Sequence, residues 1–330
     1  MQLPRNPNNL LYTISLSIVM LLACPLSYAG AVSDRIMEYR LQQTQDIEDA
    51  EYVGNITLPS GAKVIHDVPY GKDSQQRMDV YLPAQAAGAP VIFMVHGGAW
   101  RLGDKGAQAV AANKVTRWVS KGFILVSANY RLLPNTAPIE QAQDIANALA
   151  TAQDKAASWG GDPTKFILMG HSAGAHLVAL LAASPEIALK VGAKRWLGAV
   201  LLDSAALDLV KIMEAKHLRL YDRAFGDDPA YWKAASPFHN ITQSATPILA
   251  VCSTLRIDSC SQADRFVNKA MLFNVRASVL EQNLTHKEIN QQLGVDGAYT
   301  DAVEAFMATL NESVMHVLAN HPSTTHRTVL

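Results

Sequence analysis

One serine in this chain stands in a setting that makes its hydroxyl a candidate nucleophile. Ser172 lies in the motif G-H-S-A-G at 170–174, between an apolar run at 165–169 typical of a buried strand and an apolar run at 176–181 typical of a helix. A tight strand-to-helix turn pushes such a side chain out of the sheet, and flanking glycines are needed because a Cβ would collide with neighbouring backbone. The helix N-terminus would stabilise negative charge developing on a substrate oxygen. The motif therefore predicts acyl-transfer chemistry at Ser172.

A second motif supplies the hydrogen-bond donors that this chemistry needs. Another strand-like apolar run at 90–95 leads into H-G-G-A-W at 96–100. Two consecutive glycines let backbone N–H groups approach a ligand without a Cβ in the way. We therefore predict an oxyanion hole formed by the N–H groups of Gly97, Gly98 and Ala173. We expect His96 and His171, which flank the two motifs, to orient these turns through hydrogen bonds.

Together these residues resemble the α/β-hydrolase family, specifically its carboxylesterase branch with an H-G-G-x oxyanion motif. That branch includes hormone-sensitive-lipase-like esterases, kynurenine-formamidase-like enzymes, and feruloyl and acetylxylan esterases. Further likenesses are Y-R-L-L-P at 130–134, G-G-D-P at 160–163 and F-G-D-D-P at 225–229, so the resemblance spans roughly residues 60 to 315. It implies an α/β-hydrolase fold with a mostly parallel eight-stranded sheet, helices on both faces and a catalytic triad.

The resemblance also implies that the triad follows the chain order serine, acid, histidine. His286 is the best histidine, because it follows a strand-like run at 277–280 and precedes a helical pattern. The acid is harder to assign, since the family's H-G-x-x-D continuation is replaced by C-S-T-L-R-I-D-S-C at 252–260. We select Asp258, which this loop carries, and keep Asp264 and Asp203 as alternatives.

The three cysteines bear on the same loop. Cys24 lies in an N-terminal apolar segment that processing would remove, which leaves Cys252 and Cys260 to pair with each other. Such a disulfide would clamp the loop that carries Asp258, and the loop-entropy model gives so short a closure roughly 2 to 3 kcal/mol. The alternative is a pair of buried free cysteines.

The first residues read as an export signal. Positive charge at Arg5, an apolar stretch at 10–22 and small residues up to Ala29 predict a signal peptide at 1–29, cleaved after Ala29. The apolar stretch is short for a membrane span, so no stable span is expected after processing. We therefore expect a periplasmic or secreted protein, in which a disulfide persists. An uncleaved anchor and a lipoprotein signal at Cys24 are the alternatives.

The rest of the chain fits one large domain. We assign 30–59 to an N-terminal lead-in, 60–318 to the α/β-hydrolase domain and 319–330 to a flexible tail. Patterns from 208 to 245 favour either a small cap over the pocket or ordinary crossover helices. The expected strands are 63–66, 78–82, 91–95, 123–128, 166–169, 197–202, 248–251 and 277–280.

Composition excludes several other functions. A net charge of −1 provides no electrostatic basis for binding nucleic acid. The histidines are scattered and form no H-E-x-x-H or comparable metal motif, so we predict no metal site. Neither Gly-Gly pair begins a G-x-G-x-x-G fingerprint, so no cofactor is implied.

These observations predict an exported serine esterase that cleaves small-molecule esters with small or medium acyl groups through Ser172, His286 and Asp258. An arylformamidase or a feruloyl or acetylxylan esterase would use the same machinery and differ only in the pocket walls. A non-catalytic α/β-hydrolase-fold binding protein is the alternative from another class. The sequence makes no prediction of the oligomeric state.

Overall fold

The computed structural model describes residues 53–204 and 206–319. Contacts divide the chain into Met1–Gln45 and Asp46–Leu330, and every described residue lies in the second unit. The predicted signal peptide at 1–29, most of the predicted lead-in and all but the first residue of the predicted tail therefore lie outside the described residues. In the described part, no helix combines the length and the apolar character that crossing a membrane requires.

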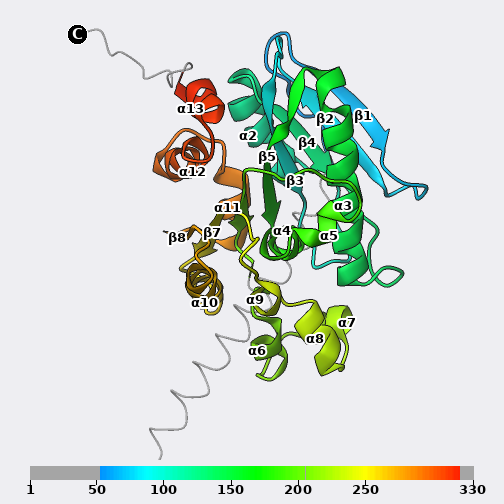
Figure 1. Ribbon diagram of the computed structural model, residues 1–330, viewed down its shortest axis with the longest axis vertical. Coiled ribbons are helices and arrows are strands. Elements are labelled where there is room, and N and C mark those ends of the chain that lie inside the picture. The colour runs from blue at the N-terminus through cyan, green and yellow to red at the C-terminus, as the bar shows by residue number, and fades with distance from the viewer. Residues whose placement is uncertain (1–52, 205, 320–330) are drawn as a thin grey trace, which may run out of the picture. The chain divides into compact units, whose positions relative to one another are not determined.

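All eight predicted strands are present and form one sheet (Figure 1). Their order across the sheet is β1-β2-β4-β3-β5-β6-β7-β8. The pairs β1/β2 and β2/β4 are antiparallel, and every later pair is parallel. The strands are β1 (Lys63–Pro69), β2 (Arg77–Leu82), β3 (Ala89–Val95), β4 (Ile124–Ala128), β5 (Gly161–His171), β6 (Gly198–Leu202), β7 (Ile248–Ser253) and β8 (Ala277–Gln282).

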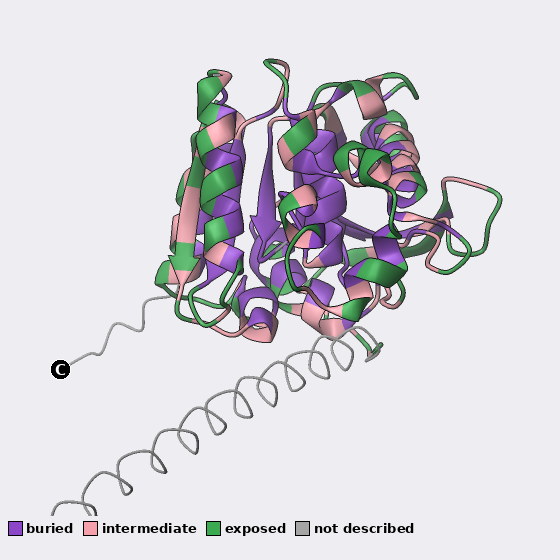
Figure 2. Cartoon of the chain, turned by 90° about the horizontal axis from the view of Figure 1, so that it is seen from below, coloured by how far each residue is buried: buried purple, intermediate pink, exposed green. Residues whose placement is uncertain are grey.

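Side chains alternate between two apolar layers, one on each face of the sheet. In β3, Val91 and Phe93 belong to one layer, whereas Ile92 and Met94 belong to the other, and all four are fully buried. Both faces of the central strands are thus covered, which is why these strands read as continuous apolar runs rather than as alternating patterns. Figure 2 shows the buried strands enclosed by helices whose outer faces are exposed.

The helices divide between these two layers. The layer that contains Phe93 is covered by α3 (Pro138–Lys155), the 3-10 turn η2 (Ala156–Trp159), α4 (Ala173–Ala183), α5 (Glu186–Leu189) and α10 (Ser259–Leu272). The layer that contains Met94 is covered by α2 (Gln108–Lys114), the π-helix η1 (Val115–Val119), α11 (His286–Gln292), α12 (Ala298–Ala308) and α13 (Glu312–Ala319). The predicted arrangement of helices on both faces of the sheet is therefore confirmed.

Between β6 and β7, the described residues form four short helices. They are α6 (Leu209–Met213), α7 (Arg219–Phe225), α8 (Pro229–Ala234) and α9 (Pro237–Asn240). Tyr221 and Phe225 of α7 are buried and join the apolar layer that contains Phe93. Their ring centroids lie 6.0 Å and 4.9 Å from that of Trp100, so this segment packs against the loop that follows β3.

Candidate active site

The predicted nucleophile occupies a strained turn between β5 and α4. Ser172 has φ +54° and ψ −119°, a conformation that residues other than glycine rarely adopt. A Cβ at Gly170 would lie 2.5 Å from the carbonyl oxygen of Gly174, and a Cβ at Gly174 would lie 2.3 Å from that of Val95. Both glycines are therefore required, because the turn brings backbone against backbone on either side of the serine.

The predicted oxyanion loop packs directly on this turn. A Cβ at Gly97 would lie 3.0 Å from both the His171 carbonyl oxygen and the Ser172 Cβ, so only glycine lets the two motifs come this close. The next three residues, Gly98, Ala99 and Trp100, all have positive φ, at +108°, +51° and +60°. Consecutive N–H groups in such a turn form a concave donor surface that suits an anion.

The strained loop is held through the indole of Trp100. Its N–H donates to Nδ1 of His176 at 3.1 Å, and Nε2–H of His176 donates to the Ala235 carbonyl oxygen at 2.7 Å. Burial lowers the pKa of His176 to about 4, so the ring is neutral and keeps the tautomer that this chain of hydrogen bonds requires. The three residues thus connect the predicted oxyanion loop to α4 and to the residue that follows α8.

The histidines beside the two motifs orient the turns. Nδ1–H of His96 donates to the Gly97 carbonyl oxygen at 2.8 Å, and the His96 ring stacks on Tyr130 with centroids 4.4 Å apart. Nε2–H of His171 donates to the His286 carbonyl oxygen at 3.0 Å. Burial and the nearby His286 hold the pKa of His171 well below its usual value, and burial also lowers the pKa of His96.

The predicted base is the first residue of α11. Thr285 caps this helix: its hydroxyl accepts from the Glu288 N–H at 3.2 Å, and the Glu288 carboxylate accepts from the Thr285 N–H at 2.8 Å. Such a reciprocal capping box fixes where a helix starts, and here it fixes the backbone of His286. The His286 ring is 6% exposed and lies with its centroid 4.4 Å from that of His171.

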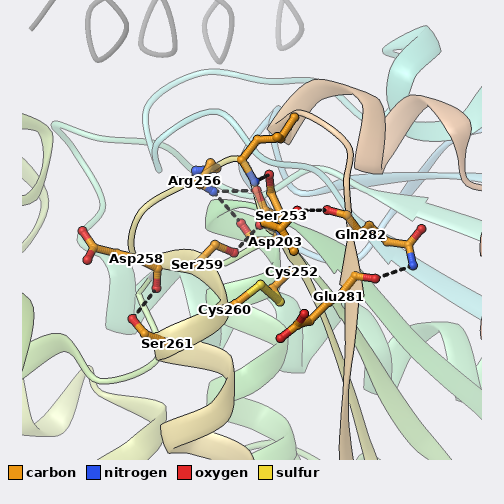
Figure 3. Close-up of a disulfide and its surroundings, with 12 residues drawn as sticks. Asp203, Cys252, Ser253, Arg256, Asp258, Ser259, Cys260, Ser261, Glu281 and Gln282 are labelled. Atoms are coloured by element: carbon orange, nitrogen blue, oxygen red, sulfur yellow. Dashed lines mark hydrogen bonds and ion pairs between the residues drawn. A yellow bond between two sulfur atoms is a disulfide. The ribbon is translucent and has the colours of Figure 1, made fainter. Parts of the chain in front are cut away.

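The acid that contacts this base is Asp203, and the selection of Asp258 was wrong. Nδ1–H of His286 donates to Oδ2 of Asp203 at 2.5 Å. Asp258 is exposed at the start of α10, where its carbonyl oxygen accepts from Ser261, and its carboxylate points away from Asp203 (Figure 3). The other alternative, Asp264, is exposed within α10. In the register of the H-G-x-x-D pattern, the acidic position holds Arg256, so the pattern itself signalled that the acid lies elsewhere.

The Asp203 carboxylate is fully buried and surrounded by donors. Besides His286, it accepts from the Ser253 N–H at 2.8 Å, from the Ser259 hydroxyl, and from Nη1 of Arg256 at 2.7 Å. Burial alone would raise its pKa, but the Arg256 guanidinium and the hydrogen bonds from His286 and Ser259 hold the pKa well below its usual value. Asp203 is therefore an ionised carboxylate that fixes the tautomer and orientation of the His286 ring.

The predicted disulfide between Cys252 and Cys260 is confirmed (Figure 3). It joins the end of β7 to the first turn of α10 and closes the loop that the sequence analysis identified. The residues that the loop places against Asp203 differ from the prediction. They are Arg256 and Ser259 rather than Asp258.

The motifs meet at one edge of the sheet. Strands β3, β5, β6, β7 and β8 are parallel neighbours, and parallel strands present their carboxyl ends at the same edge, where α/β proteins bind ligands. A small cavity of about 20 Å³ lies there. It is lined by His96, Gly97, Gly98, Gly103, Asp104, Val110, His171, Ser172, His286 and Asn290. Four of the predicted site residues therefore line one cavity, and Ala173 follows directly after Ser172.

Other features of the described chain lie apart from this chemistry. A larger hollow of about 480 Å³ lies between the start of β3 and α13 and is remote from the carboxyl ends of the strands. Within residues 53–204 and 206–319, no group of three histidine, cysteine, aspartate or glutamate side chains is arranged to hold a metal ion.

Comparison with known proteins identifies relatives of this chain. The BD-FAE family model matches residues 78–259, which is more than half of the chain. Esterase LipQ of Mycobacterium tuberculosis is 31% identical over 200 residues, which cover 56% of this chain and 47% of LipQ. Isoprenylcysteine alpha-carbonyl methylesterase ICME of Arabidopsis thaliana is 30% identical over 118 residues, which cover 36% of this chain and 27% of that protein. The chain thus spans about half, or less, of these curated relatives.

Solved structures confirm the α/β-hydrolase fold. A truncated form of a carbohydrate esterase from gut microbiota superposes with a TM-score of 0.62 at 18% identity, covering 75% of this chain and 96% of that one. Esterase Est2 of Thermogutta terrifontis superposes with a TM-score of 0.61 at 22% identity, covering 82% of this chain and 99% of that one. At these identities the likeness shows the fold alone.

Proposed function

The chain belongs to the BD-FAE family, and from this premise we propose that it is a serine hydrolase that cleaves carboxylic esters with small or medium acyl groups. Ser172 acts as nucleophile, His286 as general base and acid, and Asp203 as the residue that orients His286. The N–H groups of Gly97, Gly98 and Ala173 form the oxyanion hole.

The reaction follows from the positions of these groups. Nε2 of His286 takes the hydroxyl proton of Ser172 as Oγ bonds to the ester carbonyl carbon, and the oxyanion accepts hydrogen bonds from the backbone donors. Collapse of the tetrahedral intermediate breaks the bond to the alcohol, which leaves with the proton from Nε2. Water then attacks the acyl-enzyme by the same route, releases the acid and restores the serine.

The observation that carries the proposal is the convergence of the two motifs and the His286–Asp203 pair on one cavity. Gly97 packs against Ser172, and His286 lines the same cavity with Nδ1 bound to an ionised carboxylate. Two relatives support the proposal by their names, LipQ as an esterase and ICME as a methylesterase. The cavity has room for about one water molecule, which suits enclosure of the reacting atoms rather than of a long acyl chain.

Covalent labelling tests the proposal. A fluorophosphonate probe should attach to the wild-type protein, because stable phosphonylation needs an activated hydroxyl, and should fail to attach to Ser172→Ala. Ser184→Ala is the matched control, since Ser184 follows the far end of α4 and should label like wild type. Absence of labelling in the folded wild-type protein would instead indicate a binding protein without catalysis. A rate survey across acyl esters, formanilides and hydroxycinnamate esters then assigns the substrate class.

We also propose that the protein is exported to the periplasm or the medium. The apolar stretch at 10–22 and the small residues up to Ala29 support this, and so does the disulfide between Cys252 and Cys260, since disulfides form and persist mainly in oxidising compartments. N-terminal sequencing of the mature protein should begin at Gly30. A mature protein that retains Met1 would contradict cleavage.

A further inference from the structure

Arg256 makes a contact that a serine hydrolase of the proposed kind does not need. Its Nη1 donates to the Asp203 carbonyl oxygen at 3.0 Å and to Oδ2 of the same residue at 2.7 Å. The same Nη1 lies 2.8 Å from Nδ1 of His286. Figure 3 shows the guanidinium directed from the disulfide loop toward Asp203.

The chemistry of the three groups decides how they interact. Arginine has donors and no acceptor, and Nδ1 of His286 carries a hydrogen when it binds a carboxylate. The contact between Nη1 and Nδ1 therefore joins two donors that share one acceptor, Oδ2 of Asp203. A permanent positive charge thus lies beside the imidazole, and the carboxylate that would stabilise an imidazolium is already paired.

The loop that carries Arg256 is built around this contact. The disulfide from Cys252 to Cys260 closes it, and the Ser259 hydroxyl donates to the other carboxylate oxygen of Asp203. The neighbours of Arg256 contribute little packing, since Leu255 is 48% exposed and Ile257 is 79% exposed. Polar contacts with Asp203 and the disulfide therefore position the loop, and Arg256 is 18% exposed in a chain segment that is otherwise open to solvent.

We propose that Arg256 is a positioning residue that acts on His286 through Asp203: it pairs with the buried carboxylate and, by its charge, opposes the positive charge that forms when His286 accepts the serine proton. This inference rests on the proposed hydrolase function. When His286 accepts the serine proton, Asp203, His286 and Arg256 together carry a net charge of +1. Without Arg256, the pair of Asp203 and His286 would be neutral. Removing Arg256 therefore removes a positive charge that repels the one formed on His286 during the reaction.

Other titratable groups face the same region and remain in every variant. The His171 ring lies beside that of His286, tilted by 36°, and it is neutral, because burial holds its pKa well below the usual value. Tyr299 of α12 keeps its proton, because burial raises its pKa. Lys114 of α2 donates to Asn290 of α11, and burial lowers its pKa to about 7. A difference between variant and wild-type pH profiles therefore isolates Arg256 from these groups.

The test is the pH dependence of fluorophosphonate labelling at Ser172 and of kcat/KM for a short-chain p-nitrophenyl ester. In Arg256→Gln the acid limb should move to higher pH by about 1 unit, so that labelling one unit below the wild-type midpoint slows about ten-fold. Arg256→Lys keeps a charge without the planar fork and should shift the limb in the same direction by less. Arg195→Gln, which removes the same charge before the amino end of β6, should leave the limb unchanged.

The outcomes separate the inference from the function beneath it. If Ser172 of the wild-type protein is not labelled at any pH, the hydrolase proposal fails. If it is labelled and Arg256→Gln follows the wild-type profile, or loses rate equally at every pH, Arg256 is structural only and the inference is overturned. Should Arg256→Gln fail to fold, Arg256→Met decides, because it also removes the charge, and an unmoved limb in that variant contradicts control by the charge.

Discussion

The two sides of the cavity position their groups by different means. On the nucleophile side, formed by the loop 96–100 and the turn 170–174, backbone conformation does this: Ser172, Ala99 and Trp100 all have positive φ, and a Cβ at Gly97 would press on Ser172. On the base side, formed by Asp203, Arg256, Ser259 and His286, charged and polar side chains from three separate chain segments meet instead.

The two sides should therefore be sensitive to different kinds of substitution. The nucleophile side tolerates no added volume, because its donors lie on backbone that is already in contact with backbone. The base side instead depends on charge balance, since the ionised Asp203 is buried and must keep its partners. Substitutions that add volume should therefore disrupt the nucleophile side, whereas substitutions that change charge should disrupt the base side.

The largest expected effect is the loss of the acid. Asp203→Asn should lower kcat by about 10³- to 10⁴-fold, because the amide no longer fixes the tautomer of His286 and removes the negative charge that pairs with Arg256. Steady-state kinetics, with circular dichroism to confirm folding, measure this. Asp258→Asn is the matched control and should change the rate less than about two-fold, as expected for an exposed residue. The reverse pattern would restore Asp258 as the acid.

Added volume on the nucleophile side should come next. Gly97→Ala places a Cβ 3.0 Å from both the His171 carbonyl oxygen and the Ser172 Cβ, so the loop must move away from the serine. A misplaced oxyanion donor should lower kcat by about 10²- to 10³-fold. Gly71→Ala is the control, because the nearest atoms to its Cβ belong to the amide end of the Gln76 side chain and not to the cavity. Equal rates in both variants would exclude Gly97 from the oxyanion hole.

Removal of the disulfide tests the base side through stability. Replacing both Cys252 and Cys260 by serine should lower the free energy of unfolding by about 2 to 3 kcal/mol, as the loop-entropy model gives for so short a closure. Urea unfolding measures this loss, and wild-type protein treated with a reductant should show the same change. An unaltered urea midpoint in both samples would show that contacts with Asp203 hold the loop without the bridge.

The remaining prediction is a gradual pH dependence of stability that arises from the lysine that holds α11. Lys114 donates to two Asn290 oxygens, and burial lowers its pKa from 10.5 to about 7. Between these values the unfolded chain binds one more proton than the folded chain, so this group makes the free energy of unfolding rise with pH by about 1.4 kcal/mol per unit. Below pH 7 the folded chain carries the buried charge, and the full free-energy cost of burying it lowers stability. Above pH 10.5 the lysine is neutral in both the folded and the unfolded chain, and this cost is absent.

Comparing Lys114→Met with the exposed control Lys190→Met at several pH values between 7 and 10 checks this dependence. The rise contributed by Lys114 should disappear only in Lys114→Met. Parallel curves for the two variants would mean that Lys114 titrates like an exposed lysine and imposes no such pH dependence.

Much of the fold and one side of the site were predictable because the signals are local. Each of these signals consists of consecutive residues: the eight apolar runs, the G-H-S-A-G turn and the H-G-G-A-W loop. Steric limits on the backbone then favour strands and turns at these positions. His286 could be predicted for a related reason, since it follows closely after the last strand-like run and begins a helix with its own cap.

Only the tertiary structure decided which acid meets His286 and what surrounds it. Strands β6 and β7 are parallel neighbours, and each is followed by an aspartate, Asp203 directly and Asp258 after the loop. Spacing along the chain cannot rank the two, because the outcome depends on how the disulfide loop folds back over the strand ends. That loop turns Arg256 and Ser259 inward and Asp258 outward, and the balance of charge around Asp203 follows from this packing alone.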